Sequence, residues 1–103
     1  MEEKYKVKVL FVKSNQGKES FITAIMPYEL GTNNPSTMGC YEHIGQHGYC
    51  HDEWVRIQKR AKPEEYGYLL SELESIGYGV EIINRFDMMK TYKSRRMQLL
   101  MKF

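Results

Sequence analysis

The side chains best suited to chemistry gather in one short segment of the chain. Residues 38–54 hold all three histidines, both cysteines and the only tryptophan of 103 residues. Folding alone does not require imidazole, thiol, carboxamide and indole groups to be concentrated in this way, and the glycines among them let the backbone turn sharply. We therefore expect the functional site in this segment.

Metal binding is the first chemistry to consider. Five nitrogen or sulfur ligands lie close together in the sequence: Cys40, His43, His47, Cys50 and His51. Zinc takes four such ligands in a tetrahedral arrangement, but structural zinc sites usually join two ligand pairs across a long loop, and here the pairs nearly abut. If residues 38–44 form a strand, Cys40 and His43 point to opposite faces. We predict no metal or other cofactor, and zinc binding remains the alternative.

Two histidines with a carboxamide between them form a second candidate group. Imidazole changes near neutral pH from a hydrogen-bond acceptor to a double donor, so His43 and His47 beside Gln46 can bind a phosphate or position a water. No cluster of basic residues and no nucleophile signature accompanies them. We therefore expect binding rather than catalysis and assign no catalytic residue.

Aromatic and small polar side chains extend this candidate site. Tyr41 and Trp54 can stack on a planar base, and Asn34, in a small polar loop over residues 30–37, can read a polar edge. The chain has no glycine-rich phosphate loop, so side chains would have to hold a phosphate. The alternative is that Trp54 anchors the core and the tyrosines lie along the sheet. The predicted nucleotide-sized pocket consists of Asn34, Tyr41, His43, Gln46, His47 and Trp54.

Three strands are predicted before or within this segment. Residues 5–13 alternate between apolar and polar, and turn formers lead to a second β-rich run over 21–26, so the two should pair as an antiparallel hairpin. Pro27 should end the second strand or mark its edge. Residues 38–44 form a third strand, after which residues 46–48 should turn the chain.

The second half of the chain predicts helices and one further strand. Segment 52–59 fits a short helix or a strand equally well. Pro63 and apolar residues at helical spacing up to Ile76 predict a helix that ends at Gly77, and residues 80–83 predict a strand. The expected fold is α+β, with a small antiparallel sheet of three to four strands covered by one main α-helix.

The last residues differ from the rest in charge. Residues 1–84 carry nine basic and twelve acidic side chains, whereas residues 85–103 carry six basic and one acidic. Asp87 can cap a terminal helix whose apolar residues recur at near-helical spacing. We predict one α+β domain over residues 1–86 and a basic amphipathic C-terminal helix over 87–103. Its apolar stripe should pack either on its own domain or on a second copy, and we favour the second copy because one helix already covers so small a sheet.

Length and composition exclude several classes of protein. A chain of 103 residues with 42% apolar residues can bury one ordinary core. No apolar run approaches the roughly 20 residues of a membrane span, and the acidic start is unlike a signal peptide, so we expect a cytoplasmic protein without a membrane partner. The basic tail lacks interleaved aromatics and any groove-reading motif, so sequence-specific nucleic-acid binding is not expected.

Three segments resemble a family of short proteins encoded by bacteriophages and prophages. They are Tyr41-Glu42-His43-Ile44-Gly45-Gln46-His47-Gly48, Lys62-Pro63-Glu64-Glu65-Tyr66 and Leu73-Glu74-Ser75-Ile76-Gly77-Tyr78. The resemblance spans about residues 5–86 and is most specific in the His-Ile-Gly-Gln-His run. It implies that the two histidines and Gln46, rather than the two cysteines, belong to the shared site, and it assigns no catalytic residue.

On this resemblance we expect a phage-encoded homo-oligomer in the cytoplasm of the infected bacterium. It would sequester a small nucleotide-like immune signal from the host defence. Both histidines would contact phosphate, Gln46 and Asn34 would read polar edges, and Tyr41 or Trp54 would stack on a base. Two alternatives remain: a protein that inhibits a host defence nuclease through its basic tail, and a histidine- or metal-dependent phosphodiesterase of a nucleotide signal.

Overall fold

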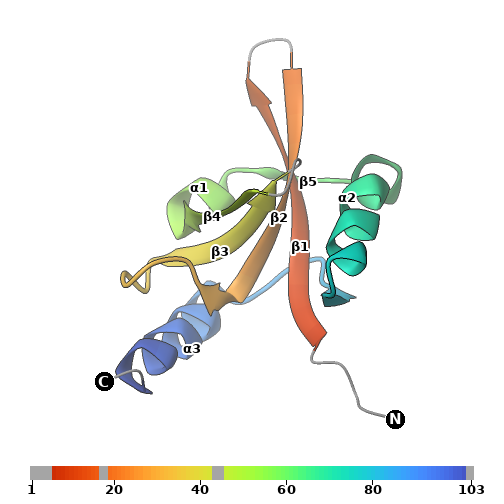
Figure 1. The fold of residues 1–103 in the computed structure, drawn as a ribbon. Helices are drawn as coiled ribbons and strands as arrows, with labels where there is room; N and C mark the ends of the chain where they lie inside the picture. Colours follow the sequence, from red (N-terminus) through yellow and green to blue (C-terminus); the bar gives the residue numbers. More distant parts are fainter. Residues whose placement is uncertain (1–5, 17–18, 43–45, 102–103) are drawn as a thin grey trace.

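The computed structural model describes residues 6–16, 19–42 and 46–101. Its elements, in chain order, are β1 (Lys6–Gln16), β2 (Glu19–Leu30), β3 (Thr37–Glu42), β4 (Gln46–His51), α1 (Asp52–Arg56), β5 (Lys59–Arg60), α2 (Pro63–Ser75), β6 (Gly79–Ile82) and α3 (Met88–Met101). The strands form one sheet in the order β4-β3-β2-β1-β5, and β6 pairs with another part of β1 (Figure 1). Neighbours are antiparallel except β1 and β6, which are parallel. No helix in these described ranges is long and apolar enough to cross a membrane.

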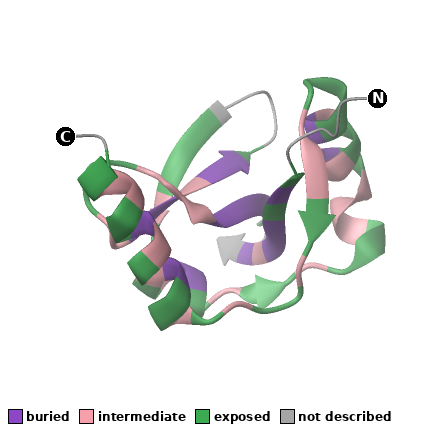
Figure 2. Ribbon diagram, turned by 90° about the horizontal axis from the view of Figure 1, so that it is seen from below, coloured by how far each residue is buried: buried purple, intermediate pink, exposed green. Residues whose placement is uncertain are grey.

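Strand β1 is buried on both faces of the sheet. Val9 and Phe11 point into a first apolar cluster with Leu69 of α2. Leu10 and Val12 point the other way, into a second cluster that includes residues of α1 and the start of α3. Figure 2 shows the buried residues running through the middle strands, with α2 on one side and α3 on the other. The alternation predicted for this strand is confirmed for the first face, but the second face is buried as well.

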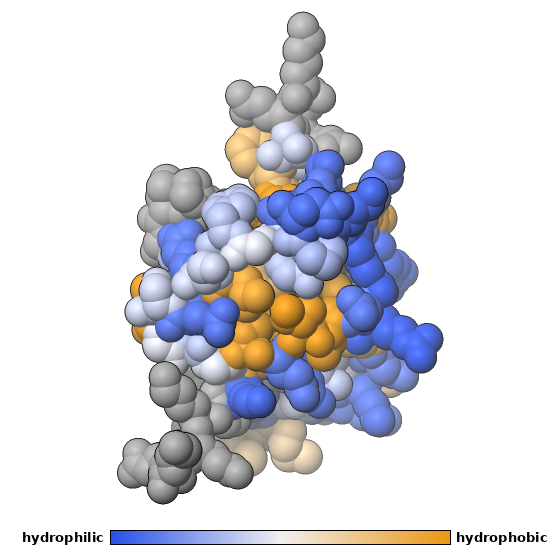
Figure 3. Space-filling model, turned by 90° about the vertical axis from the view of Figure 1, so that its right-hand side faces the viewer, coloured by the Kyte–Doolittle hydropathy of each residue, from blue (hydrophilic) through white to orange (hydrophobic). Residues whose placement is uncertain are grey.

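Two-sided burial corrects the predicted architecture. The α+β class is confirmed, but the described residues form six strands and three helices rather than three to four strands under one helix. The continuous apolar run from Val9 to Val12 places apolar side chains on both faces of the sheet, and a single helix can cover only one of them. Even on the side of α2 the cover is partial, because Ile76 and Ile82 remain exposed. Figure 3 shows the apolar patch on this side, surrounded by hydrophilic residues.

The sequence predicted that Pro27 would end its strand or mark its edge. In the structure Pro27 does not end the strand. β2 continues to Leu30, and its register with β3 shifts between Met26 and Leu30. A proline is tolerated at such a bulge because the residue there need not donate a ladder hydrogen bond. Pro27 is fully buried at this irregularity.

The predicted turn at residues 46–48 is wrong as well. These residues begin β4, which pairs with β3 from Glu42 opposite Gln46 to Thr37 opposite His51. The ambiguous segment after it contains both candidate structures, since α1 ends at Arg56 and β5 follows at Lys59. The long helix is confirmed as α2, and Gly77 ends it with a positive φ of 109°, a conformation that side chains disfavour.

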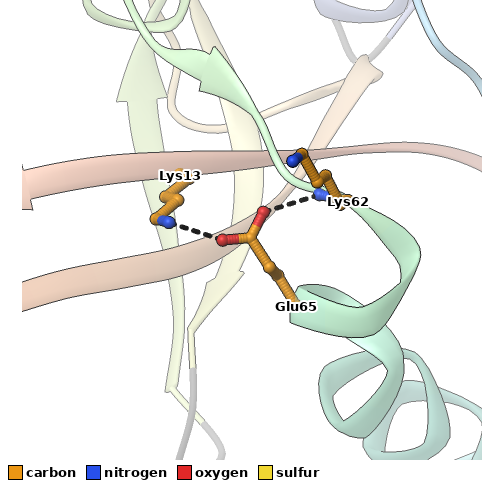
Figure 4. A network of polar contacts seen from close by, with 3 residues as sticks. All are labelled: Lys13, Lys62 and Glu65. Atoms are coloured by element: carbon orange, nitrogen blue, oxygen red, sulfur yellow. Dashed lines mark hydrogen bonds and ion pairs between the residues drawn. The ribbon is translucent and has the colours of Figure 1, made fainter.

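Glu65 ties the start of α2 to the sheet. One carboxylate oxygen accepts a hydrogen bond from the backbone N–H of Lys62, at 2.9 Å, and the other pairs with the ammonium of Lys13 in β1 (Figure 4). The first contact satisfies an N–H group at the helix N-terminus. The Lys13 ammonium, followed by the Lys62 N–H, holds the pKa of the Glu65 carboxyl below its ordinary value.

Helix α3 packs on its own sheet through its polar face, and the predicted contact of its apolar stripe with a second copy stays a prediction. Asp87 caps it, as predicted, by accepting a hydrogen bond of 3.0 Å from the N–H of Lys90. The buried residues of this helix are polar, Thr91 and Arg95. Its exposed face carries the apolar side chains Met89, Met97, Leu100 and Met101.

Arg95 explains why a polar face can be buried. Its Nε donates to the carbonyl of Pro35 at 2.8 Å and its Nη1 to the carbonyl of Pro27 at 2.6 Å. Gln98 donates in the same way to the carbonyl of Tyr28. Burial lowers the pKa of the Arg95 guanidinium, and the charge of Asp52 partly opposes this effect. The polar face of α3 therefore satisfies the carbonyl oxygens of Pro27 and Tyr28 at the irregular end of β2, and of Pro35 in the loop before β3.

Replacing Arg95 by alanine should lower the free energy of unfolding by about 2–4 kcal/mol, because two buried carbonyls lose their donors and a cavity is left. The adjacent Arg96 is exposed and serves as the matched control; Arg96→Ala should change stability by less than about 0.5 kcal/mol. Urea denaturation of both variants measures the difference. Equal effects would contradict the assigned role of Arg95.

The Glu65 contacts should stabilise the fold in a pH-dependent way. Because the folded-state pKa lies below the ordinary 4.5, the stabilisation is fully present above pH 4.5 and is lost as the pH falls through the lowered value. Glu65→Gln should therefore be less stable than wild type at neutral pH, and the gap should close on acidification. Denaturation over a pH series measures this, with Glu64→Gln as control. A gap that does not change with pH would refute the ion-pair account.

Candidate functional site

A hollow of about 420 Å³ lies beside Gly39 of β3. Its lining residues come from four strands and the segment after α2: Val7, Met26, Glu29, Leu30, Gly39, Cys40, His47, Gly48 and Tyr78. Gly39 pairs with Met26 in β2 and with Tyr49 in β4, so the row of side chains across the sheet is interrupted at this residue. A Cβ added at Gly39 would meet its nearest atom at 3.6 Å, in ordinary contact. The missing side chain therefore leaves room above the sheet without backbone strain.

His47 and Tyr78 form the rim of this hollow. The Nε2 atom of His47 and the hydroxyl of Tyr78 share a hydrogen bond of 2.8 Å. The His47 ring also meets the ring of Tyr41 edge to face, with centroids 4.9 Å apart. Tyr41 is buried and its hydroxyl donates to Oε1 of Glu72, at 2.8 Å. Tyr41 thus supports the imidazole from below, and its own ring is not open to a stacked base.

Two further predicted site residues, Trp54 and Asn34, lie apart from this hollow. Trp54 belongs to α1 and packs against the second apolar cluster, on the other face of the sheet from Tyr41. Asn34 does not line the hollow; its Oδ1 accepts from the N–H of Ser36 at 2.9 Å and shapes the loop before β3. His43 lies outside the described residues. Gln46 begins β4, and its side chain is outside the described part of the structure. Of the six predicted residues, the structure therefore brings Tyr41 and His47 together.

The sequence argument missed Gly39, Glu29 and Tyr78. Tyr78 had a detectable signal, because it directly follows the glycine that ends α2. Its N–H donates to the carbonyl of Leu73 at 3.1 Å, as in a Schellman motif, and this fixes where the residue leaves the helix. Gly39 had no such signal, since a gap in a row of side chains is a property of neighbouring strands.

The charge of the hollow is unlike that of a typical phosphate site. Its described lining includes the carboxylate of Glu29 and neither lysine nor arginine. His47, which is exposed, is the lining group best able to meet a negative charge. The described lining therefore offers a mostly apolar surface with one carboxylate and with an exposed imidazole at the rim.

The two cysteines form a separate pair. Cys40 lies opposite Gly48 and Met38 opposite Cys50, so the thiols occupy diagonal positions on the face of the second cluster. The Cys50 thiol donates to Cys40 and thereby lowers the pKa of Cys40, and the same bond, with burial, raises the pKa of Cys50. Within the part of the chain that the structure describes, no three potential ligands are arranged to hold a metal ion.

A second, smaller hollow of about 250 Å³ lies on that other face. Apolar side chains including Phe86 form its walls, and Arg56 and Arg60 stand among its lining residues. Asn34, Tyr41, His47 and Trp54 are not among its described lining residues.

Comparisons of the chain with protein-family models, curated proteins and solved structures give no match.

The thiol pair is open to a direct test. Cys50→Ala removes the donor to Cys40, so the pKa of Cys40 should rise, and Cys40→Ala should lower the pKa of Cys50 toward its ordinary value. Thiolate absorbance during an alkaline titration measures both values. A Cys40 titration that the Cys50 substitution leaves unchanged would show that the thiols do not interact.

Proposed function

We propose that this protein binds a small nucleotide-like ligand in the hollow at Gly39 and acts by sequestering it, without chemical change. The observation that carries the proposal is the pairing of a side-chain gap at Gly39 with the hydrogen-bonded His47 and Tyr78 at its rim. The resemblance to short phage proteins suggests the biological setting. In that setting the ligand is an immune signal of the infected bacterium, and the protein is a homo-oligomer that counters host defence.

The size and walls of the hollow suit a planar base. A volume of about 420 Å³ falls within the roughly 300–1,000 Å³ of small-molecule sites. Val7, Met26 and Leu30 offer apolar contact to the faces of a ring. Because Gly39 has no side chain, the ring can approach the backbone of β3 closely.

The polar groups suit the remaining parts of a nucleotide. The carboxylate of Glu29 can accept hydrogen bonds from ribose hydroxyls or an exocyclic amine. At the rim, one group can donate to a phosphate directed toward solvent while the His47–Tyr78 bond is kept. The donor is the Tyr78 hydroxyl if His47 Nε2–H donates to it, and His47 Nδ1–H if the hydroxyl donates to Nε2. In this proposal Tyr41 orients His47 instead of stacking on the base, and Asn34 and Trp54 have no contact with the ligand.

One observation favours a second candidate, inhibition of a host defence nuclease through the C-terminal helix. Helix α3 contains no acidic residue. Its exposed face combines Lys93 and Arg96 with methionines, of which Met89 is 64% and Met101 81% exposed. Flexible methionines adapt to varied partner surfaces, and the positive charge suits an acidic one.

Gly39→Val should abolish ligand binding while the protein stays folded, because the added side chain enters the hollow from an unstrained position. Gly67→Ala, where an added Cβ meets nothing within 4 Å, is the matched control. Thermal-shift measurements with cyclic nucleotides and ADP-ribose-type nucleotides test this. A ligand at one hundred times its Kd should stabilise wild type and the control by about 2.7 kcal/mol, and the valine variant not at all.

The alternatives give different outcomes in the same experiment. A nucleotide that stabilises the valine variant equally would overturn the assigned hollow, and recovery of hydrolysed nucleotide after heating would indicate an enzyme. Protection of a phage in a host with active defence should be lost in Gly39→Val. If protection is lost instead in Lys93→Glu with Arg96→Glu, the inhibitor candidate is supported. Deleting α3 would be a poor test, since it removes Arg95 from the carbonyls of Pro27 and Pro35.

A further inference from the structure

Strand β4 is an edge strand without the usual protection. It forms one end of the sheet, and no described strand pairs with its outer side. Edge strands are normally blunted by charged side chains, prolines, bulges or shortness. The other side of the sheet follows this rule, with the two-residue Lys59–Arg60 strand and a charged Glu81 in β6. The sequence of β4, Gln-His-Gly-Tyr-Cys-His, has no charged residue and no proline, and its register with β3 contains no shift.

The backbone groups that face outward can be assigned. The N–H of Asp52 donates to the carbonyl of Ser36 at 2.9 Å, which extends the β3–β4 register by one hydrogen-bonded pair. Hydrogen-bonded and non-hydrogen-bonded pairs alternate along an antiparallel ladder. Residues 48 and 50 therefore bond to β3, and the N–H and carbonyl groups of His47, Tyr49 and His51 point to the outer edge.

The side chains of this edge are also accessible. His47, Gly48, Tyr49 and His51 are all exposed, and Tyr49 is 56% exposed although it is a large aromatic residue. By strand alternation His47, Tyr49 and His51 share the face that carries the hollow. An uncharged strand with outward N–H and carbonyl groups at alternate residues can pair with a copy of itself without bringing like charges together.

We propose that two copies of this chain pair antiparallel through β4, with Tyr49 on the two-fold axis. This register matches outward-facing residues throughout: Tyr49 with Tyr49, and His47 with His51 of the second copy. A two-fold axis at Gly48 would pair His47 with Tyr49 and place His51 opposite a position outside the described strand. The dimer joins two sheets into one continuous sheet and buries the exposed tyrosine.

The dimer also completes the proposed ligand site. His51 of the second copy comes to lie beside His47, so a second imidazole reaches the rim of the hollow. The β4 pairing gives the interface of the homo-oligomer that the proposed function calls for. Its role at the ligand site therefore rests on the proposed function. Its test is independent of any ligand, because the assembled state is measured on the protein alone.

The oligomeric state of the full chain tests the pairing. Light scattering and sedimentation over a concentration series should show a dimer for wild type. Tyr49→Lys places two like charges opposite each other and should weaken dimerisation at least tenfold, whereas Tyr68→Lys, at an equally exposed tyrosine of α2, should not. A wild-type monomer at all concentrations, or equal dimerisation in both variants, would overturn the proposal.

A cross-link tests the register separately. With Cys40 and Cys50 replaced by alanine, Tyr49→Cys places two thiols at a hydrogen-bonded pair, where Cα atoms about 5.5 Å apart permit a disulfide. Mild oxidation should give a covalent dimer, and Tyr68→Cys in the same background should not. If only the control cross-links, the β4 edge is not the interface. A dimer that binds no nucleotide would refute the proposed function and leave this inference intact.

Discussion

A bulge in one strand shapes both the packing of the last helix and the candidate site. Between Met26 and Leu30, β2 departs from its regular register with β3, so nearby carbonyl oxygens need donors from outside the ladder. Arg95 and Gln98 provide these donors, which is why α3 packs with a polar face. The same irregularity places Glu29 and Leu30 in the wall of the hollow. Helix docking and site shape therefore depend on one local feature of the backbone.

Strong local signals in the sequence predicted much of the fold. The alternation in β1, the helix from Pro63, the stop at Gly77 and the cap at Asp87 each rest on residues close in sequence, and the structure confirms them. Pro27 and the polar face of α3 were not predictable in this way. A proline normally ends a strand, and apolar residues normally face the core. The first rule fails because Pro27 lies at a bulge, and the second because Arg95 donates to the carbonyl of Pro27, 68 residues earlier in the chain.

Two of the six residues predicted for the candidate site, Tyr41 and His47, lie side by side in the structure. The concentration of imidazole and aromatic side chains in residues 38–54 pointed to His47 and Tyr41, whose rings are in contact in the structure. Trp54 and Asn34 were grouped with them by nearness in sequence, yet strand alternation and a loop turn place them elsewhere. The hollow itself results from an absent side chain at Gly39. Such a gap becomes visible only when the neighbouring strands are aligned, so no pattern within β3 alone could have shown it.

Backbone NMR spectra recorded during a nucleotide titration test the central claim most directly, because every amide reports separately on its surroundings. The account predicts that the largest shift changes fall on Gly39, His47 and Tyr78, which surround one hollow although they are distant in sequence. Changes concentrated at Arg56, Arg60 and Phe86 would assign the ligand to the smaller hollow on the other face. Changes confined to α3, or none with any nucleotide, would contradict the account.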